Sequence, residues 1–234
     1  MKTKNKDMSN IILVSIEGNI GAGKSTLVKQ LQECSTTSDI NIVYLEEPVN
    51  EWNKIRDTDG VTILENFYEN PSKYAFPFQM MAYITRLKLI MNVIEENTNH
   101  INEMNKSSKT IIVMERSLWT DKNIFAKMLY DDGKIGKMEY DIYNLWFNEF
   151  IGKIPPMKVI YLKVQPSICL ERIKKRNRNG EENISLEYLK SCNQYHEDWL
   201  NQSKYSENEE KCLTIEDNNK RMTKTLKEWI QTLK

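Results

Sequence analysis

The sequence predicts an α/β fold with a five-stranded parallel sheet between two layers of helices. Five short runs rich in β-branched residues recur along the 234 residues, and segments with helical periodicity lie between them. Most runs are continuously apolar, which is typical of strands buried on both faces of a parallel sheet. No internal repeat or Pro/Gly-rich linker divides the chain. We therefore expect one domain over residues 1–234.

The expected elements alternate along the chain. The strands are IILVSI (11–16), NIVYLEE (41–47), TIIVMER (110–116), KVIYLKV (158–164) and KCLTIED (211–217). Helical periodicity is clearest in KSTLVKQLQEC, FPFQMMAYITRLKLIMNVIEE and EYDIYNLWFNEFIGK, and another helix is expected to begin near Pro166. Ligands of open parallel sheets bind beyond the carboxyl ends of the strands, so functional residues are expected just after each run.

A glycine-rich loop follows the first strand. GNIGAGKS (18–25) fits the phosphate-loop pattern G-x-x-x-x-G-K-[ST], with a strand before it and a helical segment after it. Its backbone N–H groups are expected to hold phosphates, Lys24 to reach the β- and γ-phosphates, and Ser25 to bind Mg²⁺. A chance Gly-rich turn is the alternative. The predicted triphosphate site comprises Gly18, Asn19, Ile20, Gly21, Ala22, Gly23, Lys24, Ser25 and Thr26.

Carboxylates follow the second and third strands. Glu46 and Glu47 point to opposite sides of a strand, so at most one is expected to serve the site, as a metal ligand or general base. A surface acid is the alternative. After the third strand, Glu115 is expected to hold Mg²⁺ through water, while Arg116 neutralises a phosphate or donates to a hydroxyl. A structural Glu115–Arg116 ion pair is the alternative, which opposite side-chain directions disfavour.

A basic segment follows the fourth strand. Arg172 and Arg176 are four residues apart and share a helical face, and Arg178 lies where the helix gives way to a Gly-containing loop. Such clusters are usually solvated surfaces or occasionally nucleic-acid patches. Beside a phosphate site they instead indicate a lid, at about residues 172–185, whose arginines stabilise the transferring phosphoryl group.

Composition excludes several classes of protein. The 33 basic and 33 acidic residues leave no basic excess for nucleic acid. Cys34, Cys169, Cys192 and Cys212 form no C-x-x-C pair, which favours a reducing compartment over a zinc site or disulfide framework. The first apolar run is too short for a signal peptide or a membrane span. The expectation is a cytoplasmic protein with neither a membrane nor a nucleic-acid partner.

Together these residues resemble the deoxyribonucleoside kinase family, which contains deoxycytidine and deoxyguanosine kinases. The resemblance covers roughly residues 11–217, with the motifs in order and similarly spaced. The matching segments are IEGNIGAGKST, EEPVNEW, LENFYENPSKYAFPFQ, MERS, ERIKKRNR followed by EE, LEYL and YHEDWL. It implies a kinase that transfers the γ-phosphoryl of ATP, with Mg²⁺, to the 5′-hydroxyl of a deoxynucleoside.

The resemblance also implies roles for individual residues. Glu47 matches the general base, Arg116 the group that holds the hydroxyl and the phosphate, and Glu115 a residue linked to Mg²⁺ through water. Lys24 completes the catalytic set. The implied lid arginines are Arg172, Arg176 and Arg178, and the implied partners of the 3′-hydroxyl are Tyr68 and Glu181.

A base pocket is implied in the same way. Gln79 matches the amide that reads the base edge, and Phe78 and Phe125 match the aromatics that flank the base. The pocket wall is expected to contain Trp52, Leu64, Phe67 and Ile20. Without the resemblance, the spacing of Phe78, Phe125 and Trp52 would indicate core residues.

Arg86 and Asp121 are expected to set the base preference, with the small Ala82 one turn before Arg86. Relatives that handle thymidine carry small or apolar residues at these two positions. An ionised Asp accepts from an exocyclic amine, and the pair would crowd the thymine methyl. Deoxycytidine, deoxyadenosine or deoxyguanosine is therefore expected over thymidine. A thymidine-preferring or broad-specificity enzyme is the alternative, or Arg86 and Asp121 form an ordinary surface ion pair.

Two other functions compete with this interpretation. A nucleoside monophosphate kinase would not need the carboxylate base Glu47. A non-catalytic nucleotide-binding homologue is expected to have lost Lys24, Glu47 or the lid arginines, all of which are present. The family also implies a homodimer built by the helices around 77–96 and 121–150. The lid departs from the family at Gly180, where an acid is usual.

Overall fold

The computed structural model describes Met8 and residues 10–33, 41–104, 109–201, 212–216 and 222–233. In this part of the chain, five strands form one parallel sheet in the order β2-β3-β1-β4-β5. Their bounds are β1 Ile11–Gly18, β2 Asn41–Leu45, β3 Thr110–Glu115, β4 Met157–Lys163 and β5 Cys212–Glu216. The predicted α/β sandwich with its parallel sheet is confirmed. The ends of the fifth predicted strand, Cys34 and the tail after 233 lie outside the described residues.

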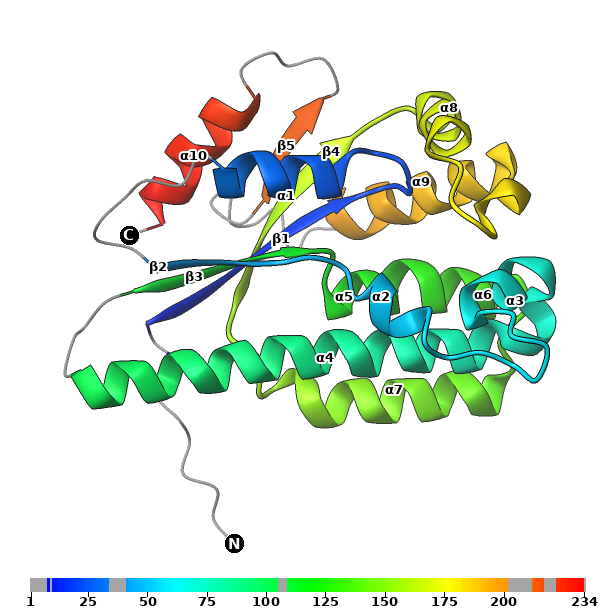
Figure 1. Ribbon diagram of the computed structural model, residues 1–234, viewed down its shortest axis with the longest axis horizontal. Coiled ribbons are helices and arrows are strands. Elements are labelled where there is room, and N and C mark those ends of the chain that lie inside the picture. Colours follow the sequence, from blue (N-terminus) through cyan, green and yellow to red (C-terminus); the bar gives the residue numbers. More distant parts are fainter. Residues whose placement is uncertain are drawn as a thin grey trace, which may run out of the picture.

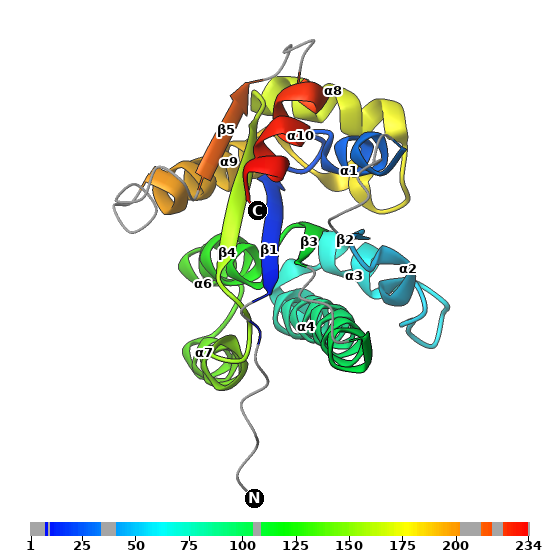
Figure 2. The same ribbon diagram turned by 90° about the vertical axis from the view of Figure 1, so that its left-hand side faces the viewer.

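Helices cover both faces of the sheet. On one face lie α1 (Lys24–Glu33), α8 (Pro166–Arg176) and α10 (Met222–Thr232). On the other lie α4 (Pro71–Met104), α7 (Lys137–Ile151) and most of α9 (Leu186–Asn201). The two layers stand on opposite sides of the strands in both views (Figures 1 and 2).

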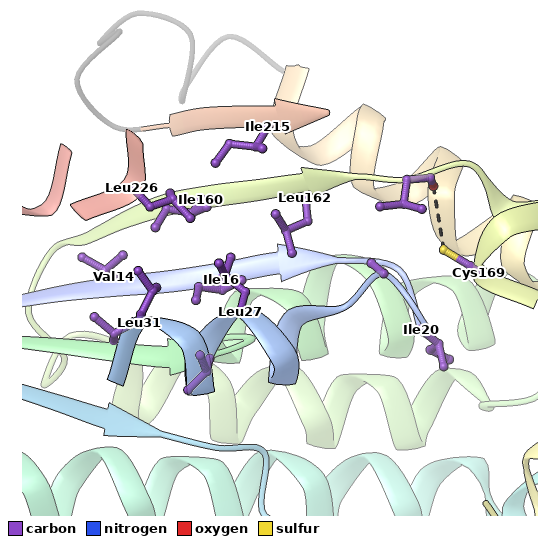
Figure 3. Close-up of a cluster of buried hydrophobic side chains, with 14 of the residues drawn as sticks. Val14, Ile16, Ile20, Leu27, Leu31, Ile160, Leu162, Cys169, Ile215 and Leu226 are labelled. Atoms are coloured by element: carbon purple, nitrogen blue, oxygen red, sulfur yellow. Dashed lines mark hydrogen bonds between the residues drawn. The ribbon is translucent and has the colours of Figure 1, made fainter. Parts of the chain in front are cut away.

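The first face has a continuous apolar core (Figure 3). Val14 and Ile16 of β1 and Ile160 and Leu162 of β4 are buried against Leu27 of α1. Side chains from α1, α8 and α10 complete the same cluster. Burying this apolar surface fixes α1 over β1, and the loop between them is thereby held at the end of the sheet.

The second face is packed mainly by α4. Tyr83, Leu87, Ile90 and Ile94 recur at helical spacing and are buried against β1 and β3. The helix is longer than the predicted segment 76–96, because it begins at Pro71 and includes Pro77 within its first turns. This length carries the helix from one end of the sheet to beyond the other.

Short elements gather at the carboxyl ends of the strands, on the right in Figure 1. They are α2 (Val49–Trp52), α3 (Ile63–Glu69), α5 (Leu118–Thr120), the π-helix η1 (Asp121–Ala126), α6 (Lys127–Asp131) and the 3₁₀ turn η2 (Glu181–Asn183). The predicted helix EYDIYNLWFNEFIGK corresponds to α7, and the helices expected around 121–150 are η1, α6 and α7. The second strand was also predicted too long, since β2 ends at Leu45 and leaves Glu46 and Glu47 in the connection.

Strand burial follows position in the sheet. The central strands β1 and β3 are almost wholly buried, as the continuous apolar runs predicted. The edge strands β2 and β5 are only partly buried. Their apolar runs therefore reflect burial on one face and strand propensity rather than burial on both faces.

Candidate active site

Two hollows meet at the carboxyl ends of the strands. The phosphate hollow surrounds the glycine-rich loop, and the acceptor hollow lies between α2, α3, α4 and η1. Lys24, Ser25, Glu115, Arg176 and Arg178 line both. A group bound in one hollow therefore lies beside a group bound in the other.

The phosphate loop turns sharply between β1 and α1. Gly21 and Gly23 have φ angles of 78° and 101°, in the left-handed region that favours glycine. At Gly21 a Cβ would also lie 2.5 Å from the Cys169 carbonyl oxygen. The loop is thus free of side chains where its N–H groups face the hollow, as an anion cradle requires.

The predicted loop residues have two kinds of position. Gly21, Ala22, Gly23, Lys24, Ser25 and Thr26 line the phosphate hollow, and Ile20 lines the acceptor hollow. Gly18 and Asn19 line neither. The Asn19 side chain instead donates to the Leu189 carbonyl at 2.8 Å and accepts from the Ile20 N–H at 2.9 Å. Its position indicates that it shapes the loop rather than binds phosphate.

Lys24 is buried at the junction of the hollows. Its ammonium donates to the Asn19 carbonyl at 2.8 Å and lies 4.0 Å from Glu115 Oε1. Burial, followed by the nearby Arg116 charge, lowers the pKa of Lys24 to about 8. The carboxylates around it oppose this shift, and Lys24 remains mainly protonated at pH 7.

Four charged side chains form a buried cluster in the acceptor hollow. Arg116 Nη1 donates to both oxygens of Glu47, at 2.8 and 2.9 Å. Arg86 donates to Glu47 Oε1 at 3.0 Å, to Asp121 at 2.9 and 3.3 Å, and to the Glu115 carbonyl at 2.8 Å. Arg86 therefore contacts both Glu47, the expected general base, and Asp121, which is expected to read the nucleobase. Arg86 and Asp121 are both buried, so they are not an ordinary surface pair.

Burial and the mutual charges of these four residues shift their pKa values. Burial raises the pKa of Glu47, but Arg116, Arg86 and Lys24 outweigh it and lower that pKa to about 2. For Asp121, burial has the largest effect and raises the pKa, although Arg86 opposes it. Burial opposes the charges of Arg86 and Arg116, but the carboxylates around them raise both pKa values. Glu47, Arg86 and Arg116 are therefore shifted toward their charged forms, whereas burial shifts Asp121 toward its neutral form.

Two side chains in the acceptor hollow each have buried polar atoms without a hydrogen-bond partner. Arg116 leaves its Nε and Nη2 atoms without a hydrogen-bond acceptor, and Gln79 leaves its Oε1 without a donor. Both side chains line the hollow. Buried polar atoms are rarely left unpaired in a folded protein. These atoms are positioned to bind a ligand, an anion or hydroxyl at Arg116 and an N–H group at Gln79.

Aromatic side chains wall the deep end. Phe67 stacks on Phe78 with ring centroids 4.6 Å apart, and Trp52 meets Phe78 edge-on at 5.5 Å. Phe125 lies on the other side, 5.1 Å from the Arg116 guanidinium. Leu64 and Ile20 complete the predicted wall, and Ala82 lines the hollow as well. Trp52 and Phe78 belong to an apolar core cluster and also line the hollow. The core and pocket interpretations of these two residues are therefore compatible.

The lid joins the two hollows. Arg176 donates to both oxygens of the buried Glu181, at 2.6 and 2.8 Å, and Arg178 donates at 3.3 Å. Tyr68 and Glu181, the expected partners of the 3′-hydroxyl, both line the acceptor hollow. Arg172 lines only the phosphate hollow and donates to the Ala22 carbonyl at 3.2 Å.

Gly180 places the lid against α3. Its φ is 85°, and a Cβ there would lie 3.1 Å from the Glu65 Cα. Both the backbone angle and the close approach require glycine. The departure from the family pattern at Gly180 therefore has a packing reason.

Two polar residues of the site region were not predicted. Tyr188 of α9 lines the acceptor hollow, and burial raises its pKa well above its ordinary value. Glu17 is wholly buried at the end of β1. Both residues lie in segments that match the family, Tyr188 in LEYL and Glu17 in IEGNIGAGKST, but the match gave neither of them a role.

The fold and the site define a class of protein. A phosphate loop that opens onto an enclosed acceptor hollow, with basic side chains at the junction, is the arrangement of a P-loop kinase. Within the described residues, no helix combines the length and apolar composition needed to cross a bilayer.

Comparison with known proteins narrows this class to a family. The profile of the family described as deoxynucleoside kinase matches residues 14–233. The chain therefore belongs to the deoxynucleoside kinase family, which confirms the resemblance seen in the motifs.

Named relatives agree with this assignment. A protein of Fowlpox virus (strain NVSL) named probable deoxycytidine kinase is 36% identical over 208 residues, which are 88% of this chain and 77% of that protein. Deoxycytidine kinase of Homo sapiens is 32% identical over 203 residues, covering 80% and 74% of the two chains. Mitochondrial deoxyguanosine kinase of Xenopus laevis is 29% identical over 212 residues, covering 85% and 76%.

Proposed function

We propose that the protein transfers the γ-phosphoryl group of ATP to the 5′-hydroxyl of a deoxynucleoside, as a single domain over residues 1–234. The observation that carries this proposal is the position of Glu47. Its carboxylate lies in the acceptor hollow, between Arg116 and Arg86 and beside the Lys24 end of the phosphate loop. A carboxylate beside a triphosphate site repels the donor unless it serves the acceptor.

Glu47 is the proposed general base. In the structure without substrates its pKa is about 2, which is too low for efficient proton transfer at neutral pH. A phosphoryl group bound at the free Nε and Nη2 atoms of Arg116 would compete with Glu47 for that guanidinium. The competition raises the pKa of Glu47 when both substrates are present. The base thus becomes effective as the reacting groups assemble.

The donor phosphates occupy the phosphate hollow. The loop N–H groups and Lys24 hold the β- and γ-phosphates, and Arg172, Arg176 and Arg178 approach from the lid. Mg²⁺ is proposed at Ser25 with Glu115 through water. Among the described residues, no three acidic, His or Cys side chains form a metal cluster. This suits Mg²⁺, which commonly takes one or two protein ligands together with phosphate oxygens and waters. When bound, the ion neutralises charge on the transferred group.

The acceptor base is proposed to lie between Phe78 and Phe125, with its edge on Gln79. Asp121 accepts from an exocyclic amine while its ion pair with Arg86 opposes the effect of burial, and Tyr68 and Glu181 take the 3′-hydroxyl. This favours deoxycytidine, deoxyadenosine or deoxyguanosine over thymidine. The names of the relatives, deoxycytidine and deoxyguanosine kinases, support the same preference.

A substrate panel tests the function and the preference separately. Steady-state rates are measured for the four deoxynucleosides and for dCMP, with ATP and Mg²⁺. We expect turnover of at least one amine-bearing nucleoside, with thymidine the poorest substrate. Thymidine as the best substrate would contradict the base preference, and turnover of dCMP alone would indicate a monophosphate kinase.

A homodimer is proposed through α4 and α7. Large apolar side chains are exposed on these adjacent helices, including Ile84, Met138, Leu145 and Trp146. Leu145 is 66% exposed and Met138 80% exposed, which isolated solvated helices seldom show together. Light scattering of a Leu145→Glu/Trp146→Glu variant should give a monomer mass. Ile55→Glu, at an exposed apolar residue outside these helices, is the control and should remain dimeric.

A cytoplasmic location is also proposed. The three described cysteines, Cys169, Cys192 and Cys212, form no disulfide bond with one another, which supports a reducing compartment.

A further inference from the structure

Glu17 is a buried carboxylate that the proposed chemistry does not use. It lies at the end of β1, directly before Gly18, and is wholly inaccessible to solvent. Its oxygens accept three hydroxyl hydrogen bonds. Ser15 and Ser117 donate to Oε1 at 2.5 and 2.8 Å, and Thr120 donates to Oε2 at 2.5 Å. Within the described residues, the ion pairs of Lys24, Arg86 and Arg116 are made with Glu115, Glu47 and Asp121 and not with Glu17.

Fold stability alone does not explain why the Glu17 carboxylate is buried. A buried carboxylate costs several kcal/mol unless its lone pairs are satisfied, and an apolar side chain of similar size usually serves a core better. Glu17 is instead satisfied by hydroxyls from two separate elements. One comes from its own strand, and two come from the turn that follows β3. The carboxylate therefore ties the end of β1 to that turn.

The turn carries Arg116 in an unfavourable backbone conformation. Arg116 has a φ of 61°, which lies in the left-handed region that disfavours residues other than glycine. Ser117 then returns to extended geometry and caps α5, with its hydroxyl accepting from the Thr120 N–H. A conformation of this kind persists only where its surroundings hold it.

Contacts on both sides hold this conformation. The Arg116 N–H donates to the Ile16 carbonyl at 3.0 Å, which fixes the backbone on β1. One residue further along each strand, the Ser117 hydroxyl meets Glu17, and Thr120 reaches the other oxygen of the same carboxylate. The Arg116 side chain is thereby directed to Glu47. The same strand end leads directly into the phosphate loop.

We propose that Glu17 is a positioning residue for phosphoryl transfer, which holds the Ser117–Thr120 turn so that Arg116 keeps its register between Glu47 and the phosphate loop. This inference rests on the proposed function. Glu17 touches neither substrate and acts through Arg116. A misplacement of about 1 Å at such a group can lower the rate about 10²-fold.

Thr120 offers the sharpest test. Thr120→Val keeps the shape of the side chain and removes the hydroxyl that reaches Glu17, whereas Thr120→Ser restores it. We expect Thr120→Val to lower kcat about tenfold with little change in either KM, and Thr120→Ser to remain within about twofold of the wild type. If Thr120→Val does not fold, Ser117→Ala is measured with the same expectation.

Ser15→Ala is the matched control. It also removes a hydroxyl from Glu17, but one that comes from β1 and not from the turn. We expect it to lower the melting temperature as much as Thr120→Val does and to leave kcat unchanged. An equal loss of kcat in Ser15→Ala would show that Glu17 only stabilises the fold and would overturn the proposal.

A double-mutant cycle shows whether the effect passes through Arg116. In an Arg116→Lys background, where the residual rate is measured, Thr120→Val should cause no further loss of kcat. A tenfold loss in both backgrounds overturns the proposal, as does an unchanged kcat in Thr120→Val alone. A wild type that phosphorylates no deoxynucleoside overturns the proposed function and this inference with it, which distinguishes the two failures.

Discussion

The phosphate hollow and the acceptor hollow share a border but are built differently. The longest continuous part of the wall of the phosphate hollow is one run, residues 21–27, whose backbone N–H groups are expected to hold phosphate. The acceptor hollow depends on four charged side chains from separate elements. Glu47 follows β2, Arg86 lies within α4, Arg116 follows β3 and Asp121 begins η1.

The two hollows differ in what compensates their buried charges. Loop N–H groups are neutral, so the phosphate hollow remains stable without its ligand. The charges of the acceptor cluster are stabilised largely by one another, and removing one leaves others unpaired. Substitutions in the phosphate loop should therefore have local effects, whereas substitutions in the cluster should change stability, acceptor binding and catalysis together.

Loss of the carboxylate base should have the largest effect. Glu47→Gln removes the proton acceptor but keeps the side-chain volume, and kcat should fall about 10³-fold. Nucleoside binding, measured by calorimetry, should persist. Glu46→Gln is the control because Glu46 is exposed, and its kcat should match the wild type. Full turnover in Glu47→Gln would refute the role of Glu47 as general base.

Removing Arg86 tests the interdependence of the cluster. Arg86→Met leaves Asp121 without its cation and Glu47 with one fewer, and the free energy of unfolding in urea should fall by about 3 kcal/mol. Arg86→Met/Asp121→Ala should recover part of this loss and reduce discrimination against thymidine. A double variant less stable than Arg86→Met would show that the two residues do not depend on each other.

Removing a charged side chain from the phosphate hollow should change phosphate binding and leave the acceptor hollow unaffected. Lys24→Met removes the only charged side chain of the loop itself and should lower kcat about 10²-fold. Nucleoside affinity should be unchanged, and stability should not fall, because burial already disfavours the Lys24 charge. A nucleoside dissociation constant raised as much as in Arg86→Met would contradict the separation of the two hollows.

The pH dependence of stability should show the smallest effect. Glu47 has a folded-state pKa of about 2 against an ordinary value of 4.5. Its contribution is complete above the unfolded pKa and is lost as pH falls toward 2. Between pH 5 and pH 3 the wild type should therefore lose about 2 kcal/mol more than Glu47→Gln, measured by urea unfolding. Equal losses in both proteins would show that the arginines do not stabilise the Glu47 charge.

Local patterns predicted the parts of the site that lie close together in the chain. The phosphate loop, the carboxylate after β2, the Glu115–Arg116 pair after β3 and the helix beginning at Pro166 all lie where the sequence placed them. Each depends on neighbours within a few residues, and parallel strands bring their carboxyl ends to one edge.

Other features had no local pattern to predict them. The left-handed backbone of Arg116 and the bonds from Ser117 and Thr120 to Glu17 involve contacts between residues about 100 positions apart. The family resemblance matched Arg86 with Asp121, but not with Glu47, because that contact depends on where α4 crosses the end of the sheet.

The sequence by itself determined the parallel α/β fold, the phosphate loop and the membership of a kinase family. These follow from apolar periodicity and from turns that only glycine can make, which are properties of short segments. The tertiary structure alone decided which charges neutralise one another. Because buried charges are stable only beside their partners, the packing of α4 and α5 against the strand ends set the links from Arg86 to Glu47 and from Glu17 to Thr120.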